Sequence, residues 1–547
     1  MAETSAPEIL TAKGEDMVMP DQKLWQQLRK CLTEAELITD PELRAIYSHD
    51  IAGGDAVAAA IIRPVTIEAM SKAVSVAAGL GYALVPRGSG HSYSGGTVPG
   101  NQRAVVIDVS NQDQVLEIDG TNRIVRVQAG CTWATLLEAL EPHGLRTPFF
   151  GPLSGFRSTI GGALSQRATF FGSAMYGFSD NSVVGQTIVL ADGRILTTGN
   201  GHDGRPHPQP SGPDEGALFL GDCGAFGIKA EASLRLIKRA GAEAFASFAY
   251  DSMAAMLAAQ VALSGSEGMA ECFGFDRQAH INLAKGGFEV LEGLEIVRDV
   301  LGQQGSPTQR LGRMVQLFRK GKRKVMDLQC SLHLCIEGED EDHARARLAR
   351  AGAVATRLGG EAVPDTIPRV TRSRPFRPIK ALLGPDGERW LPFHGVFRLG
   401  DIVDAHAALA TTLVTHAPAL LTHEMKISFL TVSSGDTIIL EPHLFWPDSL
   451  HKFHRHHATN GQLKRFGDRP EQPQVRAFAH NLRRQLGDVL HKAGAEHLQI
   501  GRHYPYEQDM DPLRRELMQA IKRMLDPDGL MAPGTLFSVE LPMTAAD

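Results

Sequence analysis

The first 240 residues alternate between short apolar runs and amphipathic segments. Residues 60–64 and 83–86 are apolar runs of strand length, and residues 66–80 between them place apolar positions with the period of a helix. A further apolar run at 105–109 predicts another strand, and two alternating runs on either side of the Asp-Gly pair at 119–120 predict a hairpin. The pattern therefore predicts a compact region of mixed helices and strands.

The pattern changes near residue 240. Beyond it, longer helical segments are separated by strands such as 328–336 and 437–441, and a short helix is expected before the first domain at 22–36. We therefore expect an α+β chain. Its parts are an N-terminal lead at 1–40, a first domain at 41–240, a second domain of sheet and helices at 241–500, and a C-terminal return to the first domain at 501–547.

Composition places the chain among globular proteins. Of its 547 residues, 43% are apolar and 22% are charged, which disfavours the disordered, collagenous and coiled-coil classes. The net charge of −6 gives no positive field that would attract nucleic acid. The six cysteines lack CxxC spacing, which is typical of buried thiols in a reducing compartment. Because the first 20 residues do not have the pattern of a signal peptide, we expect a cytoplasmic protein.

Glycine is enriched and clustered, and the densest cluster follows the apolar run at 83–86. A backbone rich in Gly and Ser can point several N–H groups and hydroxyls at one phosphate without a clash from Cβ atoms. The segment is neither a Rossmann nor a Walker loop. It therefore predicts a site for an anionic cofactor. The residues concerned are Arg87, Gly88, Ser89, Gly90, His91 and Ser92, and the cluster continues to Gly96.

Two alternatives without redox chemistry remain open on these residues. The segment 90–94 is close to the GxSxG nucleophile elbow of α/β-hydrolases, but its spacing differs by one residue and no helical pattern follows. A serine hydrolase is therefore one alternative. A non-catalytic module that binds an anion is the other.

Several segments, taken in order, resemble the vanillyl-alcohol oxidase and p-cresol methylhydroxylase (PCMH-type) superfamily of FAD-linked oxidases and dehydrogenases. The resemblance implies a PCMH-type FAD-binding domain of two α+β subdomains and a substrate (cap) domain of sheet and helices. It also implies FAD as cofactor, with an alcohol oxidised by hydride transfer to flavin N5. The matching segments are 47–50, 86–95, 127–130, 158–162, 190–193, 224–228 and 526–529.

The resemblance also assigns the contacts to FAD. The loop from Arg87 to Ser92 would hold the pyrophosphate, and a histidine in this Gly-His-Ser context is bonded to the flavin 8α carbon in several branches of the superfamily. His91 is therefore a candidate for a covalent link, and noncovalent FAD is the alternative. Backbone contacts to the flavin and its chain would come from Thr159, Ile160, Gly161, Gly162 and Ile228.

Candidate catalytic residues lie in the second domain and in the return segment. The segment with Glu441 and His443 follows an apolar strand, and both residues are candidates for the base, while Arg502 is a candidate for binding a carboxylate or phenolate. Tyr504 is a third candidate for the base, or a residue beside the phenolate of a 4-hydroxybenzylic substrate. The substrate class stays open between a 4-hydroxybenzylic alcohol and a 2-hydroxy acid, and the electron acceptor between dioxygen and a redox carrier.

A metal is not expected. The histidine-rich run at 451–457 alternates with Lys452 and Arg455, which indicates a solvated surface rather than a metal site. Some hydroxy-acid dehydrogenases of the superfamily carry a His-Ala-Gly-Asp-Gly-Asn-x-His metal segment, and this sequence lacks it. We therefore predict no catalytic metal.

Two basic stretches are candidates for interaction surfaces. Residues 310–324 hold seven basic side chains and no acidic one among apolar residues, a pattern typical of peripheral membrane or partner docking. The Pro-interrupted stretch 369–380 is a candidate for attracting an anionic substrate. A solvated basic face is the alternative for both. We also expect the chain to form a homo-oligomer.

Overall fold

The computed structural model describes residues 22–54, 56–209, 211–285, 327–373, 375–376 and 382–537. The basic stretch 310–324 lies outside the described residues, and the stretch 369–380 is described only in part. Within the described ranges, no helix combines the length and the apolar character that crossing a bilayer requires.

The first subdomain is built on a four-stranded sheet in the order β1-β2-β4-β3, in which β2, β4 and β3 run parallel. Thr66 caps the helix that connects β2 to β3 by accepting a hydrogen bond from the backbone of Ala69. The apolar side chains that predicted this helix pack on the sheet. The elements are α1 (Gln22–Leu28), β1 (Leu37–Ile38), α2 (Pro41–Tyr47), β2 (Ala60–Ile62), α3 (Ile67–Gly79), β3 (Ala83–Arg87) and β4 (Ala104–Asp108).

The expected helix at 22–36 is wrong beyond Leu28, where α1 ends. The physical reason is the buried carboxylate of Glu36. It accepts hydrogen bonds from the backbone and hydroxyl of Thr33 at 2.9 and 2.7 Å and from the backbone of Val65 at 2.8 Å. These bonds hold residues 33–36 in a turn against the following strand, so the helix cannot continue.

The second subdomain is a five-stranded sheet in the order β5-β6-β10-β8-β9. The helices α4 and α5 pack on it through one apolar cluster that also contains residues of β6 and β10. The two sheets together form the two α+β subdomains that the sequence predicted. The elements are β5 (Val115–Asp119), β6 (Ile124–Gln128), α4 (Trp133–Leu140), α5 (Ile160–Gln166), β8 (Val183–Val189), β9 (Ile195–Thr198) and β10 (Ile228–Arg235).

Short elements connect this half to the rest of the chain. The strand β7 (Leu145–Arg146) pairs with β11 (Ile237–Lys238), and α6 (Ser173–Tyr176) contacts β13 and β18 of the larger sheet described next. The 3-10 turns are η1 (Val109–Asn111), η2 (Glu141–His143), η3 (Ser179–Ser182) and η4 (Glu215–Phe219).

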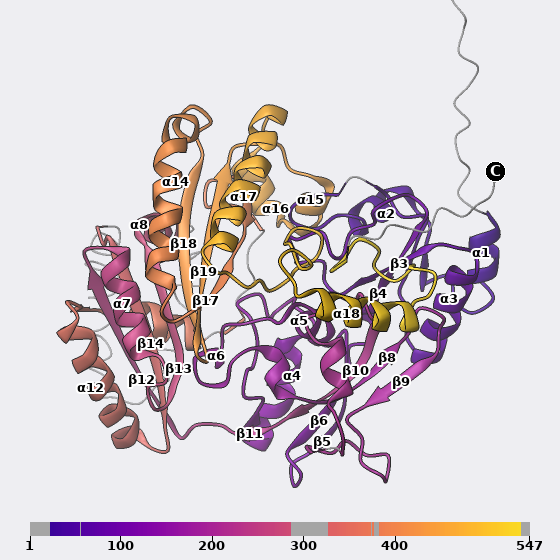
Figure 1. Cartoon of the computed structure of the whole chain (residues 1–547), viewed down its shortest axis with the longest axis horizontal. Helices are drawn as coiled ribbons and strands as arrows, with labels where there is room; N and C mark the ends of the chain where they lie inside the picture. The colour runs from indigo at the N-terminus through magenta and orange to yellow at the C-terminus, as the bar shows by residue number, and fades with distance from the viewer. Residues whose placement is uncertain are drawn as a thin grey trace, which may run out of the picture.

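The second half is an eight-stranded antiparallel sheet in the order β15-β12-β14-β13-β18-β19-β16, with β17 also paired to β19. Helices α12, α7, α14 and α17 pack side by side along it (Figure 1). The strands are β12 (Ala242–Tyr250), β13 (Met269–Asp276), β14 (Cys330–Gly338), β15 (Glu361–Val363), β16 (Arg389–Pro392), β17 (Gly395–Arg398), β18 (Lys426–Ser434) and β19 (Thr437–Trp446). The helices are α7 (Met253–Leu263), α8 (Arg277–Lys285), α12 (Glu341–Arg357), α13 (Thr366–Ser373), α14 (Ile402–Thr422), α15 (Lys452–His457), α16 (Asn460–Phe466) and α17 (Pro473–Lys492).

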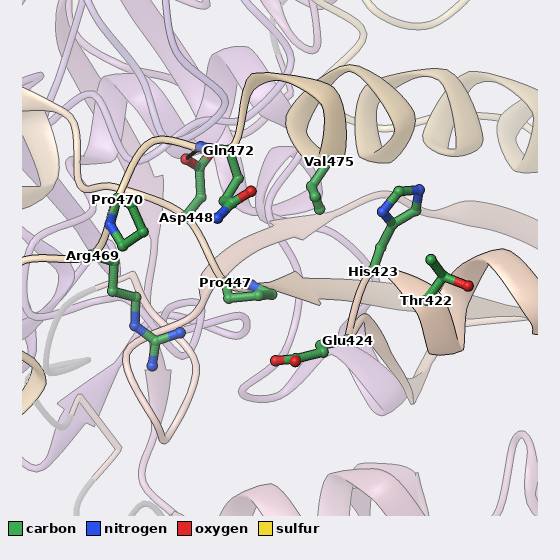
Figure 2. Close-up of a pocket in the computed structure, with 9 residues that line it drawn as sticks. All are labelled: Thr422, His423, Glu424, Pro447, Asp448, Arg469, Pro470, Gln472 and Val475. Atoms are coloured by element: carbon green, nitrogen blue, oxygen red, sulfur yellow. Dashed lines mark hydrogen bonds between the residues drawn. The ribbon is translucent and has the colours of Figure 1, made fainter.

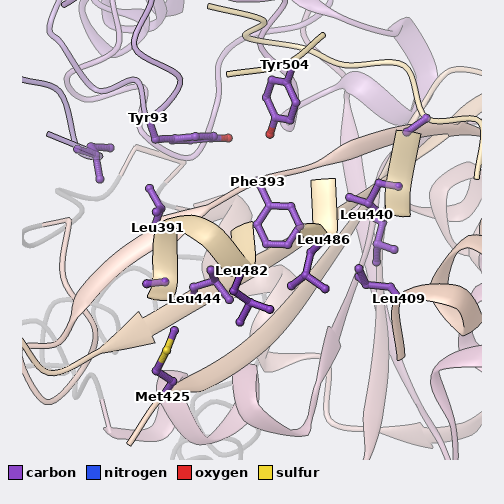
Figure 3. Packing of buried hydrophobic residues seen from close by; sticks show 14 of the residues in the cluster. Tyr93, Leu391, Phe393, Leu409, Met425, Leu440, Leu444, Leu482, Leu486 and Tyr504 are labelled. Atoms are coloured by element: carbon purple, nitrogen blue, oxygen red, sulfur yellow. The ribbon is translucent and has the colours of Figure 1, made fainter. Parts of the chain in front are cut away.

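The alternation of side chains along β19 separates its core from its polar residues. Leu440 and Leu444 lie in the apolar cluster with residues of α14 and α17, as Figure 3 shows. Glu441 and His443 have the opposite parity and therefore lie on the other face of the sheet. Tyr93 and Tyr504 also belong to this cluster, and Figure 3 shows their hydroxyl ends directed toward each other.

The last described segment returns to the first subdomain. Helix α18 (Pro512–Leu525) packs on β8 and its neighbours, and residues 530–532 then run beside β3. Leu84 of β3 donates its backbone N–H to Leu530 and accepts from Ala532, both at 2.7 Å. These bonds cover an edge of the four-stranded sheet.

Candidate functional site

The glycine-rich loop after β3 lines a cavity of about 270 Å³. Because β3 and β4 are parallel neighbours, the residues that follow them meet at one edge of the sheet. The walls therefore include Arg87 at the end of β3 and the following Gly88, Ser89 and His91, together with Asp108 at the end of β4 and the following Ser110. Tyr47, Thr132, Arg157, His456 and His457 complete much of the lining.

The loop presents unpaired donors to this cavity. Within the described residues, the backbone N–H groups of Ser89, Gly90 and His91 donate no hydrogen bond. Gly90 has φ of +72°, and a Cβ atom there would collide with the guanidinium of Arg87. The buried Arg87 thus packs against bare backbone, which is the close approach that the glycine allows. Free N–H groups beside a guanidinium form a site for an anionic group.

The first turn of α5 lies against the same loop. Thr159 caps this helix by accepting from the backbone of Gly162 at 3.2 Å, and a Cβ atom on Gly88 would collide with the Thr159 hydroxyl. Gly161 donates to the carbonyl of Ala129 at 2.8 Å, and Ile160 is buried beside it. The structure thus brings residues 159–162 next to the loop, and it places Ile228 at the start of β10, buried in the same core as β3.

His91 is a neutral imidazole with a fixed tautomer. Its Nδ1 lies 3.0 Å from the carbonyl oxygen of Ser89, which can only accept, so Nδ1 carries the proton and Nε2 keeps its lone pair. Burial lowers the pKa of His91 to about 4, and the nearby Arg157 and Arg87 lower it further against the bond to Ser89. The His91 ring centroid lies 5.2 Å from that of His457. A neutral Nε2 can bond to an electrophilic carbon.

Two of the expected catalytic residues form a cluster with a residue of the loop. The hydroxyl of Tyr93 donates to Glu441 Oε1 at 2.9 Å, and His443 Nε2 lies 3.4 Å from Glu441 Oε2. Burial raises the pKa of Glu441, but the contacts with His443, His394 and Tyr93 outweigh it, so the pKa lies below its ordinary value. Gln499 Nε2 also contacts the Tyr93 hydroxyl at 3.2 Å. The cluster therefore holds an ionised carboxylate on a side chain that is 20% exposed.

Tyr504 and a buried arginine extend this cluster. The Tyr504 hydroxyl accepts from the backbone of His394 at 2.8 Å and lies 3.2 Å from its Nδ1. Arg483 of α17 is only 3% exposed, and its Cζ lies 5.7 Å from the centroid of the Tyr93 ring. Burial raises the pKa of both tyrosines and lowers that of Arg483. In the part of the chain that is described, Arg483 Nε and Nη2 have no hydrogen-bond partner.

Arg502 makes its contacts elsewhere. Its guanidinium Nε and Nη2 donate to the carbonyl of Pro533 at 3.2 and 3.1 Å, while its backbone N–H donates to Ser94 at 2.9 Å. Burial lowers the pKa of Arg502. Arg502 thus contacts the loop and the C-terminal segment. The buried guanidinium that lies beside Tyr93 belongs to Arg483 instead.

Sequence reasoning missed Tyr93, Arg483 and Gln499. Tyr93 is the one aromatic residue between Arg87 and Gly96, which is a signal that the pattern offered. Arg483 directly follows Leu482 on an apolar stripe of α17, so a charged residue at a core position was the second available signal. No local pattern indicated Gln499.

The histidine-rich run is solvated only in part: Lys452, Arg455 and His456 are exposed as the sequence indicated, but other residues of the run are not. His454 is 1% exposed and Phe453 is fully buried, while His457 lines the cavity beside His91. The physical reason is that α15 packs against α2 of the first subdomain. Among the described residues, no group of three or more His, Cys, Asp or Glu side chains is arranged to hold a metal ion.

In the described part of the basic stretch 369–380, the arginine side chains form ion pairs within the protein. Arg372 is buried and pairs with Glu271, Glu337 and Glu243, and Arg369 pairs with Asp365 at 2.6 Å. These arginines are therefore neither a solvated face nor open to an anionic substrate.

A second cavity, of about 330 Å³, lies at the end of α14 and the start of α17 (Figure 2). None of its lining residues belongs to the glycine-rich loop or to the Tyr93 cluster. It is lined by Thr422, His423, Glu424, Pro447, Asp448, Arg469, Pro470, Gln472 and Val475.

Residues 58–199 match the family model described as FAD binding domain. The chain contains an FAD-binding domain. The unpaired N–H groups, Arg87 and the residues of α5 that line or adjoin the 270 Å³ cavity fit the phosphates of this cofactor. FAD is thus confirmed as the cofactor, and the two α+β subdomains around the cavity are the FAD-binding half.

Sequence relatives are similar to this chain over a limited region that includes the FAD-binding domain. The glycolate oxidase subunit GlcD of Bacillus subtilis (strain 168) is 32% identical over 197 residues, or 36% of this chain and 41% of the relative. D-lactate dehydrogenase [cytochrome] 1, mitochondrial, of Saccharomyces cerevisiae is 30% identical over 209 residues, or 38% of this chain and 34% of the relative. The chain therefore spans less than half the length of these curated relatives.

Solved structures are similar over nearly the whole FAD-binding chain and confirm its fold. p-Cresol methylhydroxylase with substrate bound gives a TM-score of 0.69 at 15% identity, covering 94% of this chain and 96% of that one. The isoeugenol complex of 4-ethylphenol oxidase from Gulosibacter chungangensis gives 0.67 at 14% identity, covering 95% and 98%. Alkyldihydroxyacetonephosphate synthase gives 0.66 at 15% identity, covering 97% and 89%. The PCMH-type fold predicted from the sequence is confirmed.

Proposed function

We propose that the protein is an FAD-dependent oxidoreductase that oxidises the hydroxyl-bearing carbon of a 2-hydroxy acid. The observation that carries this proposal is Arg483, a buried guanidinium with two N–H-bearing nitrogens unpaired beside Tyr93. Arg483 has the Tyr504 hydroxyl as a partner, but burying its unpaired Nε and Nη2 is costly, and a substrate carboxylate would pair with these two nitrogens. The sequence relatives support this class, because their names include glycolate and D-lactate.

Glu441 has the position and charge of a base for the substrate hydroxyl. It is held ionised by His443 and Tyr93, and it lies on the strand face opposite the core of the cap domain. Oxidation breaks the O–H and C–H bonds of the substrate, so that a proton goes to Glu441 and a hydride leaves the carbon. When bound, FAD supplies the hydride acceptor. Dioxygen or a redox carrier would then remove the two electrons.

We also propose that His91 carries the cofactor covalently. The support is its neutral imidazole, with the proton fixed on Nδ1 and the lone pair on Nε2. A bond from Nε2 to the 8α carbon replaces a C–H bond there, and the two electrons and two protons released pass to the same acceptor as in turnover. Acid-precipitated protein should stay yellow, and the colour should leave the pellet in His91→Ala. Colour released from the wild-type pellet would contradict the covalent link.

A second candidate substrate is a 4-hydroxybenzylic alcohol. It is favoured by the hydroxyls of Tyr93 and Tyr504, which point toward each other beside Arg483 (Figure 3). Two phenols and a guanidinium suit a phenolate oxygen. The whole-length structural relatives named for p-cresol and 4-ethylphenol support this class.

Anaerobic mixing separates these substrates. We expect 2-hydroxy acids to bleach the visible flavin absorbance of the purified protein. 4-Hydroxybenzyl alcohol is tested in the same way, as the second candidate substrate. Arg483→Met should raise KM for the acid by about 100-fold, because a charge-assisted pair is lost. Arg484→Met is the matched control, since Arg484 is the exposed neighbour on α17. Bleaching by the phenolic alcohol alone would select the second candidate, and bleaching by neither would contradict both.

A further inference from the structure

Helix α18 exposes a continuous apolar stripe. Leu513, Leu517 and Met524 are 72%, 58% and 69% exposed, and Ala520 is exposed between them. Their spacing of four, three and four residues places all four side chains on one face of the helix. No described residue covers this face, whereas solvent-facing helix positions are ordinarily polar. The stripe is therefore an unpartnered apolar surface.

The opposite face of α18 is already used. Met518, Ile521 and Leu525 pack on the apolar cluster around β8, and the Lys522 ammonium donates to the carbonyls of Ala225 and Met531 at 2.6 and 2.8 Å. The helix is thus fixed on the FAD-binding half by one face, and Figure 1 shows it lying across that half.

The spacing of the stripe is that of a coiled-coil seam. With Leu513 and Ala520 at d positions and Leu517 and Met524 at a positions, the residues Glu516 and Arg523 both fall at g. Both are exposed. In an antiparallel pair of identical helices, g positions of one helix face g positions of the other, so each Glu516 would meet Arg523 of a second copy. In a parallel pair, Glu516 would lie opposite Ile521 of the second copy, and the ion pair with Arg523 would not form.

We propose that α18 is the contact through which a second copy of this chain binds, as an antiparallel, two-fold symmetric helix pair. The stripe is complementary to itself: Leu513 packs on Met524 and Leu517 on Ala520 of the other copy, flanked by two Glu516–Arg523 ion pairs. A two-fold axis repeats the same patch on both subunits, which closes the assembly at a dimer. The exposed charges beside the stripe are Arg514, Glu516 and Arg523. Glu516 finds an opposite charge in Arg523 of a second copy, whereas an anionic lipid surface would repel it.

Sedimentation velocity of the full-length, FAD-loaded protein over about a hundredfold range of concentration tests this contact. We expect a concentration-dependent dimer, and Leu517→Glu should leave a monomer with unchanged flavin content and melting temperature. The matched control is Val414→Glu, because Val414 is 74% exposed on α14 and should leave the dimer intact. A monomeric wild type, a dimer that survives Leu517→Glu, or a dimer that Val414→Glu breaks equally would overturn the proposal.

A charge swap tests the antiparallel orientation. Glu516→Arg and Arg523→Glu should each weaken the dimer, since each creates like charges across the contact. The double variant Glu516→Arg/Arg523→Glu should restore the wild-type dimerisation constant to within a few fold, because the pairs are re-formed with reversed sign. A double variant as weak as the singles would overturn the antiparallel pairing.

Discussion

Tyr93 and Glu441 are 348 positions apart in the sequence, and their side chains share a hydrogen bond of 2.9 Å. Tyr93 lies two residues after His91, in the loop that lines the FAD cavity, whereas Glu441 lies on β19 of the eight-stranded sheet. One short segment of backbone therefore joins the cofactor site to the proposed base. A change at Tyr93 should affect the ionisation of Glu441 without removing the cofactor.

Replacing Tyr93 with Phe should move the acidic limb of the kcat/KM profile to higher pH. The Tyr93 hydroxyl is one of the groups that lower the pKa of Glu441, so its removal raises that pKa. A base with a raised pKa is protonated at a higher pH, and kcat should fall about tenfold as well. The pH profile with a substrate that bleaches the flavin measures both effects. Tyr250→Phe, which removes a buried phenol from the helix side of the sheet, is the control. An acidic limb at its wild-type position would count against Glu441 as base.

Gly90→Ala should reduce FAD binding. The Cβ atom would displace the guanidinium of Arg87, and the positive φ at Gly90 adds strain of about 1 kcal/mol. The ratio of flavin to protein absorbance after purification, and the Kd for added FAD where the link is not covalent, report the loss. Gly204→Ala carries the same sign of φ in open space, so it should keep its flavin. Equal flavin content in both variants would argue against the loop as the phosphate site.

Arg146→Met removes an ion pair between the two halves and should lower the free energy of unfolding by about 3 kcal/mol. Arg146 of β7 donates from Nη2 to both oxygens of Glu337 on β14, at 2.7 and 2.6 Å, and both side chains are buried. Glu337 keeps Arg372 as a second partner, which limits the loss. The midpoint of urea unfolding measures the change. Arg126→Met removes the pairs of a half-exposed arginine with Glu117 and Glu231 and should cost less than about 1 kcal/mol. Equal shifts would mean that the buried pair contributes no more than a surface one.

Asp448→Asn should lower stability at neutral pH and flatten its dependence on acid. Burial raises the pKa of Asp448, but the bonds from Arg476 and from the backbones of Gln472 and Ser449 outweigh it and lower the pKa to about 2. A depressed carboxyl pKa stabilises the folded state above the unfolded pKa, near 4, and this stabilisation is lost as pH falls toward 2. The free energy of unfolding of the wild type should therefore fall by about 2 kcal/mol over this range. The variant lacks this contribution at every pH.

Urea unfolding at a series of pH values tests the prediction for Asp448. The control is Asp488→Asn, an exposed carboxylate on α17 that should leave the wild-type slope unchanged. Parallel slopes for wild type and Asp448→Asn would contradict the assignment.

The sequence could predict the elements whose burial is decided locally. The apolar run of β3, the capped helix α3 and the hairpin β5–β6 were expected at nearly their observed bounds, because alternation and helical period fix which side chains face a core. The strand expected at 437–441 is confirmed, but β19 continues to Trp446, so the position of His443 on the same face as Glu441 came from the structure. The helix expected at 22–36 failed because the buried bonds of Glu36, including one to Val65, stop it.

Contacts between distant segments could not be predicted in this way. The position of Arg483 beside Tyr93 depends on how α17 packs on the eight-stranded sheet. The guanidinium of Arg502 donates a hydrogen bond to the carbonyl of Pro533, which lies in another segment. The burial of His454 likewise follows from the packing of α15 on α2, while its sequence context of Lys452 and Arg455 indicates a surface. Each of these is a relation between elements, which no periodicity within one element reports.

The pairing of β3 with residues 530–532 has a consequence for the order in which the protein is synthesised and folds. The strand that leads directly into the cofactor loop has its outer edge covered only when Leu530 and Ala532 bond to Leu84. During translation, that edge stays open while more than 440 residues are added, and open edges invite pairing with other chains. The cofactor site is therefore completed late in synthesis, although the loop that forms it is made early.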